Sequence, residues 1–170
     1  FELDARRLGT FQHALLESFH LSLRQEKRLW HELSVQEAKQ RLEQLATETM
    51  FEFHQGLIRD SASNQLIAAS MSQTLGHLIG ILIEWMQTYR FEPSRVELKF
   101  GGQDAPLPAW KLPLDGQASM VIRGVIDRLD LCDMQGDQTL AVVIDYKSSP
   151  KKPDLRLSWN GLQLQLPVYL

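Results

Sequence analysis

Two carboxylates in the second half of the chain, with a lysine beside them, could form a site for a divalent cation. Asp145 and Lys147 lie in the Val/Ile-rich segment 139–147, and Asp127 lies among the apolar residues of segment 118–131. Side chains alternate along a β-strand, so Asp145 and Lys147 are expected on one face and Tyr146 on the other. A carboxylate within an apolar strand is costly unless something pairs with it. Two such carboxylates beside an ammonium group predict a site for Mg²⁺, at which the lysine could position a water or offset phosphoryl charge.

The acid-x-Lys triplet alone is a weak signal, because it occurs three times, at 37–39, 97–99 and 145–147. The first copy falls on a predicted helix, where residues two apart diverge. The second falls on a predicted strand but has no acid upstream on a neighbouring strand. Only 145–147 follows a strand that carries one, Asp127. An ion pair between Asp127 and Arg128 remains the alternative to metal binding, and Asp130 is expected to be solvated at the strand end.

The elements that must position these residues change character near residue 91. Up to that point apolar residues recur at helical spacing, from Leu8 to Leu23, after a Ser34–Glu37 capping box, and again over 71–86. Residues 61–64 break the pattern, and the second helix is expected to include Phe53 and Leu57.

After Glu92-Pro93 the pattern becomes that of strands. Residues 95–100 alternate, which places Glu97 with Arg95 and Lys99 on the polar face. Segment 107–112 is a weak strand, and segments 118–131 and 139–147 are the strongest, joined by a hairpin turn at 135–137. An amphipathic segment from Asn160 is expected to form the final helix.

Composition narrows the class of protein. With 170 residues, 44% of them hydrophobic, and a net charge of −3, the chain is expected to form a single domain over 1–170 with a mainly helical part, 1–91, and a sheet part, 92–170. Its longest apolar run, 78–86, contains Glu84, so no membrane span is expected, and no export signal is visible. The chain starts at Phe1 without a methionine and ends in an apolar run, so we expect it to be a segment of a longer protein.

Four motifs in order resemble the RecB-type nucleases of the PD-(D/E)XK superfamily, above all the C-terminal nuclease domain of the AddB/RexB component of bacterial ATP-dependent helicase–deoxyribonucleases. They are the Gly-x-x-x-His helix at 9–13, the strand 124–130 with Val-Ile-Asp-Arg, the Ile-Asp-Tyr-Lys segment 144–147 and the Gln-x-x-x-Tyr pair in 161–170. The resemblance implies a restriction-endonuclease-like α/β fold, with a mixed, mainly antiparallel sheet flanked by helices and preceded by a helical half.

The resemblance also implies a role for each motif residue. Asp127 and Asp145 would be metal ligands, and Lys147 would be the catalytic lysine. The metal shell would be completed by His13 and the backbone carbonyl of Tyr146. Two residues on one helix face would support the lysine and the DNA phosphate, and a further acid on the first strand would join the site; these are Gln165, Tyr169 and Glu97.

The implied activity is Mg²⁺-dependent (or Mn²⁺-dependent) hydrolysis of DNA by the exonuclease module of a bacterial, cytoplasmic helicase–nuclease in double-strand-break repair and recombination. DNA and helicase domains or a helicase subunit are the implied partners. Proteins of the AddB type also carry four cysteines for an iron–sulfur cluster, whereas this chain has only Cys132, so a cluster would need cysteines outside the segment. Two alternatives stay open: a catalytically silent DNA-binding scaffold, and a free-standing exonuclease of the CRISPR-associated or phage type.

Overall fold

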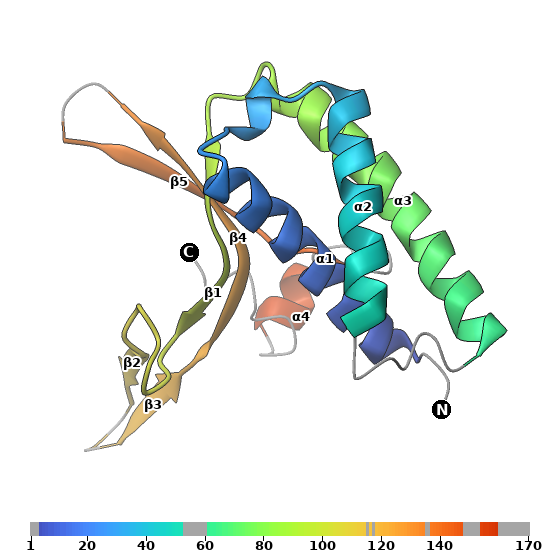
Figure 1. Cartoon of the computed structure of the whole chain (residues 1–170). Coiled ribbons are helices and arrows are strands. Elements are labelled where there is room, and N and C mark those ends of the chain that lie inside the picture. The colour runs from blue at the N-terminus through green and yellow to red at the C-terminus, as the bar shows by residue number, and fades with distance from the viewer. Residues whose placement is uncertain are drawn as a thin grey trace. The chain divides into compact units, whose positions relative to one another are not determined.

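The chain divides into a helical unit and a sheet unit. The computed structural model describes residues 4–52, 61–114, 116, 118–134, 137–147 and 154–159. One compact unit comprises Phe1–Pro93 and Tyr146–Lys151, and the other comprises Ser94–Asp145 and Lys152–Leu170. The predicted order, helices first and a mainly antiparallel sheet second, is confirmed (Figure 1).

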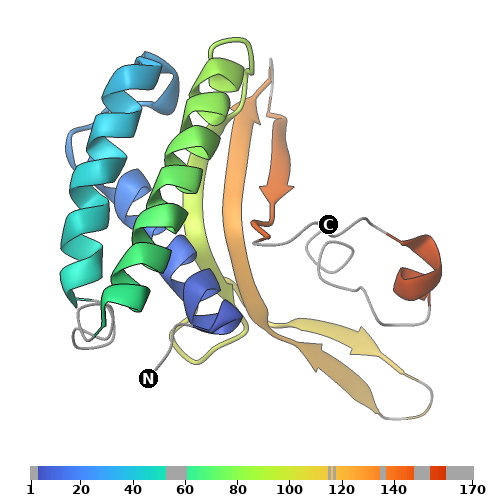
Figure 2. The same ribbon diagram turned by 90° about the vertical axis from the view of Figure 1, so that its right-hand side faces the viewer.

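The helical unit contains α1 (Ala5–Gln25), the 3₁₀ turn η1 (Trp30–Glu32), α2 (Val35–Glu52) and α3 (Ala62–Met86). Helices α2 and α3 lie along each other in both views, and α1 packs against both (Figures 1 and 2). The apolar stripe predicted for the first helix is its buried face: Phe11, Leu15 and Phe19 are fully buried and Leu23 nearly so. These side chains share one core with buried residues of α2 and α3.

Serine caps set where α2 and α3 begin. The hydroxyl of Ser34 accepts a hydrogen bond from the N–H of Glu37 at 3.2 Å, as the predicted capping box requires. Ser61 likewise accepts from the N–H of Asn64 at 3.1 Å. Residues 61–64, expected to interrupt helical structure, are therefore the cap and first turn of α3, because serine favours that position. The expected continuation of α2 through Phe53 and Leu57 lies outside the described residues.

Helix α3 is more apolar than its sequence pattern suggested. By length and composition alone it could cross a membrane: an 18-residue window has a mean hydropathy of 1.6, and 39% of that window is buried. The apolar part of α3 is thus longer than the run 78–86, and the absence of a membrane span stays an expectation. A core helix of a soluble protein passes the same test, and Leu75, Ile79 and Ile83 of α3 do lie in the core of the helical unit.

The sheet unit has a three-stranded sheet in the order β1 (Glu92–Phe100), β4 (Gly124–Asp133), β5 (Thr139–Ile144). Strands β4 and β5 are antiparallel, and the N–H of Met134 donates to the carbonyl of Gln138 at 2.9 Å, which confirms the predicted hairpin. A second antiparallel pair is formed by β2 (Trp110–Pro113) and β3 (Ser119–Ile122) (Figure 2).

Two predicted strands are shorter than expected. Segment 118–131 is two strands, interrupted at Arg123, because β3 pairs with β2 whereas β4 pairs with β5. Segment 139–147 remains a strand only to Ile144. Tyr146 instead packs against the core of the helical unit. Because residues 145–147 are not in a strand, the predicted alternation of their side chains does not apply. A short helix, α4 (Leu155–Trp159), was not predicted, and the helix expected from Asn160 lies outside the described part of the chain.

Candidate metal centre

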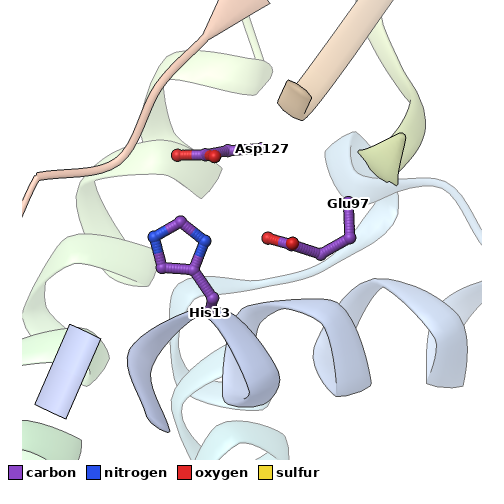
Figure 3. A group of neighbouring side chains, drawn as sticks. All are labelled: His13, Glu97 and Asp127. Carbon is purple, nitrogen blue, oxygen red and sulfur yellow. The ribbon is translucent and has the colours of Figure 1, made fainter. Parts of the chain in front are cut away.

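Two carboxylates from neighbouring strands meet within the sheet unit. Glu97 comes from β1 and Asp127 from β4, and their carboxylate oxygens lie within 4.8 Å of each other (Figure 3). Asp127 is 6% exposed and Glu97 is half-buried. Two negative charges held this close and away from water repel each other, and a cation between them would remove that cost. Carboxylate oxygens are the donors that Mg²⁺ and Mn²⁺ prefer, so the pair fits the metal that the motifs imply.

The backbone at Glu97 explains why this side chain differs from its neighbours. Its φ is +46°, in the left-handed region that a glutamate in a strand rarely adopts. The alternation of β1 predicted Glu97 on the exposed face with Arg95 and Lys99. Those two are exposed and Leu98 is buried, as predicted, but Glu97 is half-buried. A left-handed residue interrupts the regular pleat and re-aims the side chain, as residues in bulges do.

Asp145 lies one step beyond the end of the β4–β5 ladder. Arg128 is paired with Ile144, and continuing the same antiparallel register by one residue sets Asp145 opposite Asp127. The side chain of Asp145 is not among those that form the close group with Asp127. The register therefore brings the two predicted aspartates to the same end of the ladder, while the close carboxylate pair is Asp127 with Glu97.

Asp130 is buried, contrary to the expectation that it would be solvated. The guanidinium of Arg128 donates two hydrogen bonds of 2.6 Å to its two carboxylate oxygens, and both side chains are fully buried. Residues two apart on a strand share a face, so this ion pair lies on the face of β4 opposite to Asp127. Arg128 therefore has Asp130 as its ion-pair partner, and its burial does not require the alternative ion pair with Asp127.

Three further predicted site residues lie in the helical unit. His13 is half-buried on α1, and its ring stands edge-on to that of Tyr146, with the ring centroids 6.4 Å apart and an interplanar angle of 87°. Lys147 is exposed and contributes to the wall of a pocket of about 690 Å³ between α1 and α3. The chain thus leaves the sheet at Asp145 and enters the helical unit at Tyr146. Gln165 and Tyr169 lie outside the described residues.

Sequence comparison gives the family. The profile of the PD-(D/E)XK nuclease superfamily matches residues 1–170. The whole chain is 31% identical to the B subunit of an ATP-dependent helicase/deoxyribonuclease of Desulfitobacterium hafniense, 32% identical to that of Moorella thermoacetica and 30% identical to that of Clostridium perfringens. The chain spans 14–15% of the length of these relatives. As its ordered motifs predicted, the chain belongs to the PD-(D/E)XK nuclease superfamily.

Proposed function

We propose that this chain is a nuclease module that hydrolyses DNA phosphodiester bonds with the help of Mg²⁺ or Mn²⁺. The observation that carries the proposal is the close pair of carboxylates, Glu97 and Asp127, one of them buried. Two carboxylates this close make a site of high negative potential, and a divalent cation bound between them would offset their repulsion.

Asp145, His13 and the carbonyl of Tyr146 would complete the ligand set. Continuing the β4–β5 register by one residue sets Asp145 opposite Asp127, and Tyr146 is the next residue in the chain. The ring contact with Tyr146 then ties His13 to the same short segment. The carboxylate and carbonyl oxygens among these groups suit both Mg²⁺ and Mn²⁺.

The remaining residues divide the chemistry between them. A bound cation would polarise the phosphate and lower the pKa of a water. Lys147 is within two residues of Asp145, so the two Cα atoms are no more than about 7.6 Å apart. Its ammonium would orient the attacking water and offset the charge that develops on the phosphoryl oxygens. Water attacks phosphorus, the P–O bond to the leaving oxygen breaks, and that oxygen takes up a proton. Gln165 and Tyr169 would hold the lysine and the neighbouring phosphate.

The wider role follows from the names of the relatives. A chain that resembles one seventh of a helicase/deoxyribonuclease component would act beside helicase domains or a helicase subunit. We propose that it is the exonuclease module of such a complex and acts on DNA ends in double-strand-break repair and recombination in the bacterial cytoplasm.

The test is a hydrolysis assay on linear DNA with the full-length protein. Lys147→Ala, Asp127→Asn and Asp145→Asn should each lower the Mg²⁺-dependent rate by roughly 10²-fold or more, the scale expected when an electrostatic catalytic group is lost. Lys111→Ala is the matched control, because Lys111 is an exposed lysine of β2 outside every motif. Equal rates for Lys147→Ala and Lys111→Ala would remove Lys147 from the mechanism.

Calorimetric titration with Mn²⁺ separates this function from that of a silent scaffold. The nuclease requires a binding isotherm that Asp127→Asn weakens. Binding of DNA with no metal uptake by the wild-type protein would instead favour the scaffold.

A further inference from the structure

The helical unit contains a pocket whose described wall includes Lys147 and none of the carboxylates of the candidate metal site. Its volume is about 690 Å³, and it lies between α1 and α3. Most of its wall is apolar, with leucine and methionine side chains such as Leu75 and Met71, and Lys147 completes it. Volumes of about 300–1,000 Å³ with apolar walls and a few polar groups are typical of small-molecule sites.

The polar group best placed to select a ligand is the amide of Gln12. Gln12 lines this pocket and is only 5% exposed. Among the residues that the structure describes, no hydrogen bond involves its side chain. Its amide atoms are not among the fully buried polar atoms that lack a partner, so water or a ligand in the pocket can reach their donor and acceptor positions. Ser70 and Thr74 also line the pocket from α3, where the Thr74 hydroxyl donates to the backbone carbonyl of Ser70 at 3.0 Å.

We propose that this pocket receives a nucleobase of the DNA strand that is cut, next to the phosphate held by Lys147. The inference rests on the proposed function. Apolar walls would bury the faces of the base, and the Gln12 amide, which both donates and accepts, matches the mixed donors and acceptors of any base edge. The ammonium of Lys147 at the wall supplies the charge for the phosphate that every nucleotide carries.

A base can enter such a pocket only after it leaves the duplex stack. Unstacking costs a few kcal/mol and is cheapest in DNA that is already single-stranded. The pocket therefore requires a base that is already unstacked, as in a single strand or at a frayed end. It also predicts no strong sequence preference, because apolar contact with a base face is available to all four bases.

Two α3 variants of the full-length protein test the pocket. Thr74→Trp would fill it from an exposed position, and Gln73→Trp is the matched control, an exposed neighbour that does not line the pocket. On single-stranded DNA, Thr74→Trp should lower kcat/KM by at least about tenfold, in line with the loss of a buried base contact, and Gln73→Trp should not. On a strand with an abasic residue at the pocket position, wild type and Thr74→Trp should be alike.

A binding measurement keeps the inference separate from catalysis. A single-stranded oligonucleotide with 2-aminopurine next to the terminal phosphate is titrated with the protein in EDTA. Wild type and Gln73→Trp should raise the fluorescence as the base leaves its stack, while Thr74→Trp and Gln12→Leu should not.

The outcomes are distinguishable. If wild type hydrolyses DNA but the two tryptophan variants agree on every substrate, the pocket proposal is overturned and the nuclease assignment stands. If no metal-dependent hydrolysis occurs yet the fluorescence response depends on Thr74, the proposed function fails and the base site remains. If neither signal appears, both are wrong.

Discussion

Replacing Glu97 by glutamine should stabilise the metal-free sheet and weaken its response to metal. The two carboxylate groups have oxygens within 4.8 Å of each other. At that distance two unit charges repel by about 0.9 kcal/mol at a dielectric constant of about 80 and by about 3.5 kcal/mol at the value of about 20 typical near protein surfaces. Glutamine keeps the size of the side chain and removes its charge, so this repulsion between bare charges is the upper bound of the effect, because both carboxylates also have other interactions.

Hydrogen–deuterium exchange of peptides from β1 and β4 measures this locally in the full-length protein. Where exchange follows local opening, about 0.9–3.5 kcal/mol corresponds to exchange slowed between about fivefold and about 400-fold in Glu97→Gln without metal. Adding Mn²⁺ should protect the wild-type strands more than those of the variant, because a binding ligand stabilises the state that holds it.

The control is Asp104→Asn, which removes an exposed carboxylate from the turn after β1 and should change neither measurement. The reasoning fails if Glu97→Gln peptides exchange as fast as wild type without metal and gain the same protection with metal. That result would show that the two carboxylates do not interact electrostatically. The candidate site would then lose the observation on which it stands.

Three further variants probe the surrounding fold. Asp130→Ala leaves the guanidinium of Arg128 buried without its ion pair, so β4 should lose about 3–5 kcal/mol, whereas the double variant with Arg128→Met should recover most of it in the same exchange assay. Arg28 holds the pKa of Glu37 below its usual range through a hydrogen bond. The ion pair therefore stabilises the folded state above the ordinary glutamate pKa, and this stabilisation is lost as the pH falls through the lowered pKa of Glu37. In a pH series, hydrogen exchange at the start of α2 should become equal in wild type and Glu37→Gln at acid pH. Gly101→Ala should destabilise the turn after β1 by roughly 1–3 kcal/mol, because φ is +79° and a Cβ would lie 2.6 Å from Cγ of Arg123; a stability unchanged in urea unfolding would contradict this.

Periodic patterns predicted most of the fold because burial enforces them. The stripe on α1 and the alternation of Leu98 and Phe100 both follow from the need to cover apolar side chains. The patterns failed where pairing partners or chain direction change. Arg123 separates two strands that read as one, and Asp145 leaves the sheet within a segment that still reads as a strand. Neither event has a signature in local hydrophobicity.

The sequence did not predict the buried ion pair of Asp130 or the left-handed backbone at Glu97. Asp130 looks like any acid at a strand end, and only the structure shows that Arg128 holds it in the interior. The signal available was the spacing: an arginine and an acid two apart on one strand face. The local pattern offered no signal for Glu97, because alternation placed it in solvent, and only the resemblance to the family marked it as a site residue.

The geometry of Glu97 itself argues for a ligand rather than an accident of packing. A left-handed non-glycine residue costs on the order of 1–3 kcal/mol, and the carboxylate it re-aims approaches a like charge, which adds to that cost. Replacement by glycine would remove the backbone strain, and replacement by glutamine would remove the charge repulsion. A glutamate at this position is therefore not explained by stability alone. Glu97→Gly should therefore slow metal-free exchange at β1 at least as much as Glu97→Gln does, while both lose metal protection. A glycine variant that exchanges faster than wild type would show that the side chain holds β1 together through other contacts.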